Sequence, residues 1–267
     1  MSRCLFAVVV GCLVACTLQR SEAAAEWKYR KGTHFIIQYE QDISDNLASD
    51  TLREAERFYD TLARQIGYTR YRKFWTWDQR VKIVLYADQE SYVRETGLPA
   101  WSGGGATQYH RQLKSRAIVS YRQERNFLNK ILPHEISHLI LADFFGKTPV
   151  PLWFNEGVAQ LQESGKVAEA RRLIAKVAGI GYVIPLESLV RMDVRIQTNQ
   201  GVVLIFYAQS VSIVDFLIRQ HGNRRFQNLC RFMREGLPFQ RALGKAYTGI
   251  FDSPAQLEEK WLYSVKN

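Results

Sequence analysis

Residues Leu132–Leu139 have the sequence LPHEISHL, which contains the pattern His-Glu-x-x-His. In a helix, His134 and His138 would lie one above the other on the same face, because they are four residues apart. Two imidazoles placed in this way can bind one zinc ion, each through a ring nitrogen about 2.0–2.1 Å from the metal. Glu135 lies near the edge of that face, where it can accept a proton from a water molecule without being a ligand. The stretch therefore predicts a zinc site on a helix.

A third ligand is predicted at Glu156, eighteen positions after His138. A catalytic zinc site has three protein ligands and keeps a fourth position open for water. Glu156 lies in the sequence PLWFNEGVA of residues 151–159, close to Trp153 and Phe154. A carboxylate in such an apolar frame is costly to bury unless it is paired, and a metal ion would pair with it. The alternative is an exposed glutamate in the first turn of a helix, where the helix dipole favours a negative charge.

Together, the two motifs resemble those of the gluzincins, and more closely those of the peptidase MA-like proteins of bacterial cell envelopes. Such proteins share a Trp-x-x-Glu-Gly-x-Ala block downstream of the first motif, which Trp153–Ala159 matches. They have a late helix that opens with Tyr-Ala-Gln, as at Tyr207–Gln209, and often end in a Glu-x-x-Trp helix, as at Glu258–Trp261. The resemblance implies a zincin-like fold, a zinc cofactor and a role for Tyr207 in catalysis.

These residues lead to the hypothesis of a zinc-dependent peptidase that acts on a peptide or protein substrate. His134, His138 and Glu156 bind Zn²⁺. Glu135 acts as the general base, which takes a proton from water and passes it to the leaving amine. Tyr207 is, by the resemblance, a donor to the oxyanion of the tetrahedral intermediate, and the alternative is an ordinary tyrosine at the edge of the core.

A second hypothesis, from a different class, is a zincin-like binding or scaffold protein of the envelope that has no turnover. A scaffold has no need of a general base, so the presence of Glu135 beside the three ligands argues against it. Asp143 could orient a ligand histidine, or it could be an ordinary acid at a helix end. The sequence leaves the substrate, the mode of cleavage and the oligomeric state open.

Residues 1–25 are predicted to be a signal peptide, because Arg3 precedes an apolar run at Leu5–Leu18 that is too short to span a membrane. Ala23–Ala25 offers a cleavage site before Glu26, whereas the residues before Cys16 resemble a lipoprotein box that would make Cys16 a lipid anchor. Both readings predict export to the periplasm or cell envelope, or secretion. Three of the four cysteines lie in this segment, so no disulfide within the chain is expected.

The charge of the chain is strongly positive, with a formal net charge of +10 at pH 7. A basic surface on an exported protein favours acidic partners such as anionic lipid headgroups or cell-wall polymers, and it makes nucleic acid an unexpected partner. A scatter of solvated lysines and arginines is the alternative.

The chain is long enough for one large domain, since 46% of its 267 residues are hydrophobic. We predict an α+β fold in which residues 26–146 form a small, mostly antiparallel sheet with helices and the zinc helix, and residues 147–267 form a helical half with the third ligand. The expected strands are residues 34–40, 81–86 and 116–121. The expected helices are residues 43–66, 88–96, 128–145, 152–163, 166–178, 186–191, 204–220, 224–235 and 255–265.

Three local features carry further expectations. Residues 26–32 are expected to be a polar entry segment, and the glycine-rich residues 102–107 a loop. Strand 116–121 either binds the substrate backbone, as the resemblance implies, or is an ordinary sheet strand. Pro133 is awkward inside a helix, so the zinc helix either begins there or is kinked.

Overall fold

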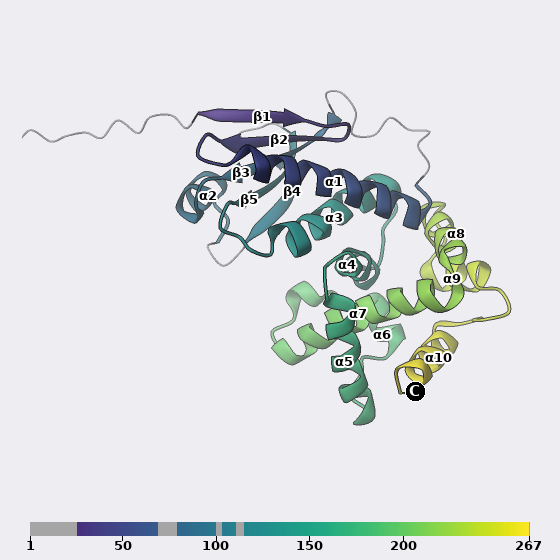
Figure 1. Cartoon of the computed structure of the whole chain (residues 1–267). Coiled ribbons are helices and arrows are strands. Elements are labelled where there is room, and N and C mark those ends of the chain that lie inside the picture. Colours follow the sequence, from purple (N-terminus) through teal and green to yellow (C-terminus); the bar gives the residue numbers. More distant parts are fainter. Residues whose placement is uncertain (1–25, 69–78, 100–102, 111–114, 267) are drawn as a thin grey trace, which may run out of the picture.

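The computed structural model describes residues 26–68, 79–99, 103–110 and 115–266. The predicted signal peptide and Cys16 lie outside the described residues. Figure 1 shows a sheet with its helices in one half of the molecule and a set of packed helices in the other, with α4 (Leu152–Leu161) between them. The α+β class is therefore confirmed.

The sheet has five strands in the described residues, in the order β1-β2-β3-β5-β4. Its strands are β1 (Trp27–Lys31), β2 (Phe35–Glu40), β3 (Val81–Tyr86), β4 (Gly104–His110) and β5 (Ser115–Tyr121). The two outer pairings are antiparallel, but β2–β3 and β3–β5 are parallel. The expectation of a mostly antiparallel sheet was therefore wrong. The cause is the connections, because α1 (Asp45–Ile66) and α2 (Gln89–Thr96) lie between the paired strands and only a long crossover can return the chain in parallel.

Two helices complete the first half before the predicted metal site. Helix α1 (Asp45–Ile66) begins after Ser44, whose hydroxyl accepts a hydrogen bond from the backbone N–H of Leu47, and it ends at Gly67 in the left-handed conformation. Its apolar face packs against the sheet and α3 (Leu132–Phe145). The shorter α2 (Gln89–Thr96) begins after Asp88, which caps it as predicted.

Two edge strands lie in segments where no strand was predicted, and one of these segments was expected to be a loop. Residues 27–31 form β1, whose polar side chains suit an edge, and residues 104–110, which include most of the glycine-rich run, form β4. A Cβ atom at Gly104 would lie 2.8 Å from the Ile131 side chain and 2.8 Å from the carbonyl oxygen of Val119. Glycine is therefore needed at residue 104, because the turn before the helix that carries His134 and His138 comes close to the strand here. This glycine reflects close packing and does not indicate a loop.

Strand β5, which was expected to receive the substrate backbone, lies inside the sheet. Both of its edges are paired, one with β3 and the other with β4. It has no free backbone groups for an added strand, so that role is excluded for residues 116–121. The open edge on this side of the sheet belongs to β4.

The helix that carries His134 and His138 begins with a π-helical turn. This turn, η2 (Phe127–Ile131), runs directly into α3 (Leu132–Phe145), and the backbone N–H of Leu132 bonds to the carbonyl of Phe127. Pro133 lies in the first turn of the α-helix, where its missing N–H needs no partner. Of the two expectations for Pro133, the structure has the helix beginning there.

The second half consists of helices and one short 3-10 turn. They are α4, α5 (Lys166–Gly179), α6 (Leu186–Arg191), η3 (Val194–Ile196), α7 (Gln200–His221), α8 (Asn223–Arg234), α9 (Phe239–Ala246) and α10 (Pro254–Lys266). Helix α9 was not predicted, although its buried residues Phe239, Ala242, Leu243 and Ala246 have helical spacing.

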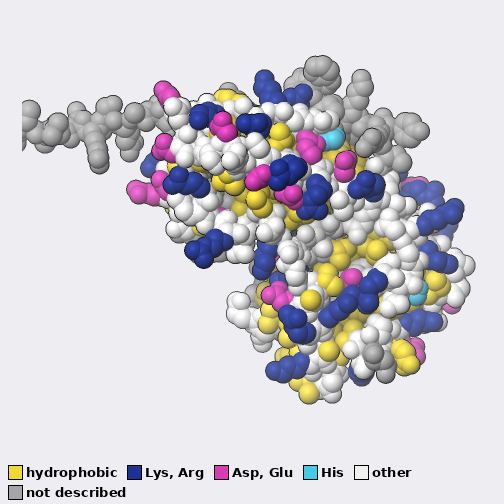
Figure 2. Space-filling model, in the orientation of Figure 1, with side chains coloured by type: hydrophobic (Ala, Val, Ile, Leu, Met, Phe, Trp, Pro, Cys, Tyr) yellow, Lys and Arg dark blue, Asp and Glu magenta, His cyan; other side chains and the backbone are white. Residues whose placement is uncertain are grey.

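Helix α7 is the central helix of this half. It contacts α4, α5 and α8. Among the described residues, it alone is long and apolar enough to cross a membrane. Within the protein, 61% of its most apolar window is buried, as expected for a core helix. The charged side chains lie outside this core, and Figure 2 shows Lys and Arg spread over both halves of the visible face.

Candidate metal centre

The structure brings the three predicted ligands together between α3 and α4. The Nε2 atoms of His134 and His138 are 2.9 Å apart, and the Glu156 carboxylate oxygens lie 3.9 Å and 3.7 Å from them. One donor atom from each residue lies within 4.8 Å of the other two. Ligands about 2.0–2.2 Å from a tetrahedral metal would be about 3.3 Å apart, so the three donors need only small shifts to hold an ion.

The opposite nitrogen of each imidazole is held by an acceptor on α4 or just after it. Nδ1 of His134 lies 2.8 Å from Oε1 of Glu163, and Nδ1 of His138 lies 3.1 Å from Oδ1 of Asn155. Because both partners accept, each Nδ1 carries the proton and each Nε2 turns its lone pair toward Glu156. Two lone pairs and a carboxylate directed at one point form a site for a cation, and the residues present therefore fit a metal ion.

The electrostatics of the two histidines differ. Burial lowers the pKa of His134, but the hydrogen bond to Glu163 and the charges of Glu135, Glu163 and Glu156 outweigh it, so the pKa is raised. Burial and the neighbouring His134 lower the pKa of His138. Burial raises the pKa of Glu156. The side chains of His134, His138 and Glu156 are partly buried and remain open to solvent, with exposures of 22%, 25% and 15%.

Glu156 is placed by an unusually close crossing of α4 and α7. A Cβ atom on Gly157 would lie 2.6 Å from the carbonyl oxygen of Ser210, so only glycine permits this approach. The crossing brings Tyr207, one turn before Ser210, within electrostatic range of Glu156. Burial and the Glu156 charge raise the pKa of Tyr207, which keeps its hydroxyl protonated and able to donate a hydrogen bond.

Glu135 is half-buried, one residue after the first ligand, and its charge acts on both imidazoles. Asp143, considered as a partner of a ligand histidine, instead pairs with Arg116 on β5. The partner of His134 is Glu163, which the sequence analysis missed. Its only local signal was an acidic residue seven positions after Glu156, two residues beyond the end of α4.

Comparisons with known proteins bear on the fold and on the family. The solved structure of native yeast LTA4 hydrolase is similar to this chain with a TM-score of 0.51 and 12% sequence identity, over 89% of this chain. Since this chain covers 39% of that protein, the likeness concerns the fold, which is that of a gluzincin. The fold is thus metallopeptidase-like and zincin-like.

The family follows from the sequence itself. A family model described as the Peptidase MA superfamily matches residues 78–267, and the chain belongs to this superfamily. No curated protein matches the chain. The matched residues include α3, α4 and α7, which carry the three donors and Tyr207.

Proposed function

We propose that this protein is an exported zinc-dependent peptidase. The observation that carries the proposal is the convergence of His134, His138 and Glu156 on one point, with Glu135 beside them. Membership of the Peptidase MA superfamily supports zinc as the metal. Two imidazoles and one carboxylate are a ligand set of catalytic zinc sites, which keep one position open.

The proposed chemistry assigns a separate task to each residue. Zinc in such a site lowers the pKa of water to near neutrality and polarises a carbonyl group. The Glu135 carboxylate takes a proton from the attacking water and delivers it to the leaving amine. The protonated hydroxyl of Tyr207 donates a hydrogen bond to the oxyanion. Glu163 and Asn155 hold the two imidazoles in the orientation that binding requires.

The open edge of β4 is the proposed support for an extended peptide substrate. β4 lies beside the start of α3, and its outer edge has no partner strand among the described residues. An extended chain added there would form backbone hydrogen bonds and lie near the N-terminal turn of α3, which carries His134 and Glu135. This placement replaces the role first considered for β5.

Export is part of the proposal and rests on residues 1–25. The mature chain should begin at Glu26, or at a lipidated Cys16 that would attach it to a membrane. Mass spectrometry of the native N-terminus distinguishes these outcomes, and a soluble cytoplasmic form that keeps Met1 would contradict both.

Replacement of Glu135 by glutamine tests the proposed enzyme against a silent scaffold. Glutamine keeps the shape of the side chain but cannot act as a base, so hydrolysis of peptides should fall by about 10²–10⁴-fold. Zinc content and the unfolding temperature should stay unchanged, because Glu135 is not a ligand in this proposal. The control is Glu169→Gln, an exposed change on α5 that should leave activity intact.

Two results would count against the proposal. Loss of zinc together with activity in Glu135→Gln would make Glu135 a ligand or a structural residue. Equal activity of the variant and the wild type, or no hydrolysis by either across a broad peptide library, would favour a binding or scaffold protein.

A further inference from the structure

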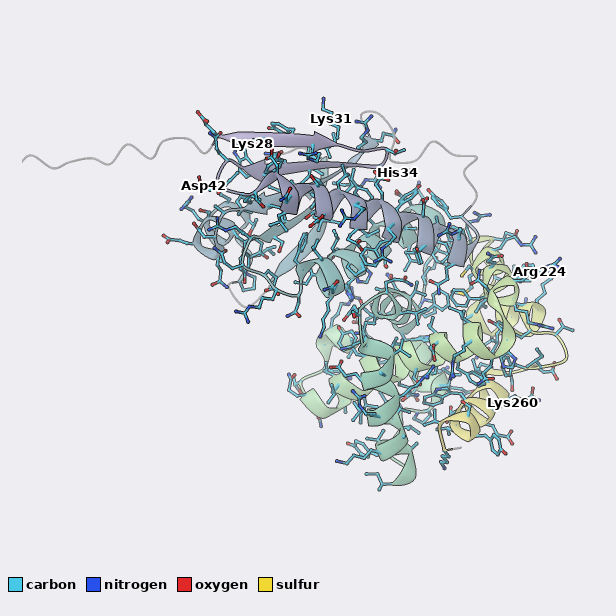
Figure 3. The ribbon with its side chains drawn as sticks, in the orientation of Figure 1. Lys28, Lys31, His34, Asp42, Arg224 and Lys260 are labelled. Carbon is cyan, nitrogen blue, oxygen red and sulfur yellow. The ribbon has the colours of Figure 1, made fainter. Side chains whose placement is uncertain are left out.

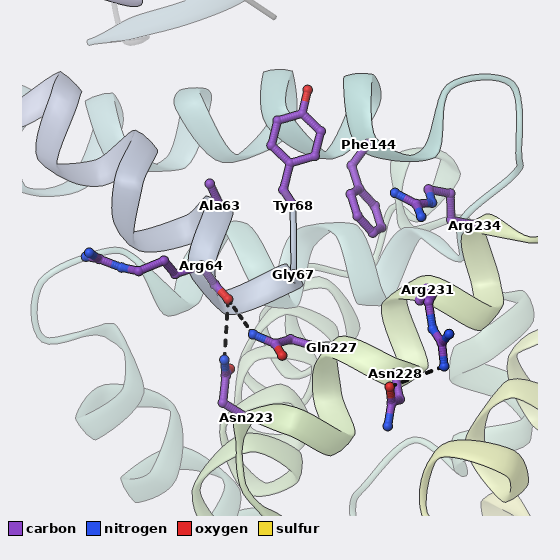
Figure 4. Close-up of a pocket in the computed structure, with 10 residues that line it drawn as sticks. All are labelled: Ala63, Arg64, Gly67, Tyr68, Phe144, Asn223, Gln227, Asn228, Arg231 and Arg234. Carbon is purple, nitrogen blue, oxygen red and sulfur yellow. Dashed lines mark hydrogen bonds between the residues drawn. The ribbon is translucent and has the colours of Figure 1, made fainter. Parts of the chain in front are cut away.

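A second pocket lies at the far end of the metal helix. It has a volume of about 560 Å³ and is formed by the end of α1, the end of α3 and one face of α8 (Figure 4). Phe144, which lines it, follows His134 by ten residues, which corresponds to about 15 Å along the helix axis. The pocket is therefore separate from the metal centre, and nothing in the proposed reaction uses it.

The charge of the pocket is entirely positive. None of the ten residues that line it is acidic, and three are arginines, Arg64, Arg231 and Arg234. Within the part of the chain that the structure describes, none of the three forms an ion pair. Figure 4 shows Arg64 at one end of the pocket and the other two at the opposite end. Unpaired cations near one another repel, and an anion between them would relieve that repulsion.

Arg231 and Arg234 are held in place by aromatic rings. The guanidinium carbon of Arg234 lies 4.7 Å from the ring centre of Phe144, and that of Arg231 lies 4.8 Å from the ring centre of Phe232. Lys245 lies over the same Phe232 ring at 4.8 Å. One Nη of Arg231 also donates a 3.4 Å hydrogen bond to Oδ1 of Asn228, and both arginines are exposed. A guanidinium whose flat face rests on a ring directs its other N–H groups outward from the ring edge, and this is the edge that binds oxyanions.

The rest of the pocket is partly apolar, and a hydrogen bond joins two of the helices that form it. Gln227 donates a hydrogen bond of 2.7 Å to the backbone carbonyl of Arg64, which ties α8 to the end of α1. The rings of Tyr68 and Phe144 meet edge to face, 5.9 Å apart. The pocket thus combines two ring-stacked cations at one end with an uncharged surface beside them.

We propose that this pocket binds a phosphate-bearing ligand, with the phosphate at Arg231 and Arg234 and the uncharged part of the ligand over Tyr68 and Phe144. Phosphate suits this end better than a carboxylate does. A carboxylate has two oxygens, which one guanidinium satisfies, whereas a phosphate has more acceptor oxygens and up to two charges for two guanidiniums. The inference is independent of the proposed peptidase activity.

Calorimetric titration of the full, zinc-loaded chain with inorganic phosphate in a chloride buffer tests the site. The variant Arg231→Gln/Arg234→Gln should bind phosphate at least tenfold more weakly than the wild type. Arg231→Lys/Arg234→Lys, which keeps the charge but lacks the planar fork, should also bind more weakly. Because phosphate can bind zinc, the titration is repeated after the metal is removed with a chelator, and binding should persist.

The matched control is Arg224→Gln/Arg241→Gln, which removes the same charge from α8 and α9 outside the pocket. Both residues are exposed, and Arg224 lies at the outer edge of the molecule (Figure 3). Its affinity for phosphate should stay within about a factor of two of the wild type, as expected for distant surface charges. All variants should keep the wild-type unfolding temperature and zinc content, which separates loss of binding from loss of fold.

Vesicles distinguish the two sources of such a phosphate. If vesicles of phosphatidylcholine and phosphatidylglycerol bind the wild type and the control but not Arg231→Gln/Arg234→Gln, the ligand is a lipid headgroup. If phosphate binding depends on the two arginines but vesicle binding does not, the ligand is a soluble phosphate compound. Wild-type affinity for phosphate weaker than about 10 mM, equal binding by Arg231→Gln/Arg234→Gln, or an equal loss in the control would overturn the proposal.

Discussion

Replacement of Glu163 by glutamine should weaken zinc binding while leaving the fold intact. Glu163 lies just beyond α4, and its Oε1 is 2.8 Å from Nδ1 of His134. Only 12% of its side chain is exposed, so solvent screens this interaction little. Glutamine keeps an acceptor at the same place but lacks the charge, which should make the imidazole a poorer ligand.

The size of the effect follows from this contact. A hydrogen bond to a charged group contributes about 1.5–3 kcal/mol, and about 1.4 kcal/mol corresponds to a factor of ten in affinity. Glutamine retains part of the bond, so the zinc affinity should fall by roughly tenfold. Alanine removes the acceptor altogether, so the loss should approach roughly a hundredfold, the upper range for residues that orient metal ligands.

Competition with a chromophoric chelator measures these affinities directly. Glu169→Gln is the control, because Glu169 has a side chain that is 57% exposed and only a 3.8 Å contact with Lys166. Its affinity for zinc should match the wild type. A zinc affinity of Glu163→Gln within a factor of two of the wild type would refute the reasoning, since the contact would then do nothing to orient His134.

Three further predictions test the surroundings of the site. Gly157→Ala should destabilise the protein by about 1–3 kcal/mol in chemical denaturation, because its Cβ would lie 2.6 Å from the carbonyl oxygen of Ser210; wild-type stability would contradict the close α4–α7 crossing. Tyr207→Phe should lower kcat but not zinc content, and an unchanged kcat would make Tyr207 a packing residue. Burial raises the pKa of Glu56, but hydrogen bonds from the His34 ring and backbone outweigh it and lower the pKa (His34 is labelled in Figure 3). The stability from this pair is therefore present above the ordinary glutamate pKa and is lost as the pH falls toward the lowered pKa. Glu56→Gln should destabilise the protein at pH 7 but less at about pH 3.5. An equal difference in unfolding temperature between variant and wild type at both pH values would exclude this linkage.

The sequence by itself predicted most of the helices and strands and the three residues that meet at the candidate site. His134 and His138 are four residues apart, and any α-helix places two such residues on the same face, whatever packs around it. Glu156 was recognisable because a carboxylate in an apolar frame needs a partner. The long helix α1 and the buried strands β2 and β3 followed from the spacing of their apolar residues, which depends only on near neighbours in the chain.

The tertiary structure decided everything that depends on which faces meet. Glu163 reaches His134 across 29 positions, and Gly104 lies under Ile131 in a strand that its own sequence does not favour. The parallel pairing of β3 with β5 and the open edge of β4 likewise depend on how helices carry the chain across the sheet. The arginine pocket forms only where α8 meets the ends of α1 and α3. The spacing of apolar residues shows which face of a helix or strand is buried, but it does not show which other element packs on that face. Contacts between distant segments are therefore known only from the tertiary structure.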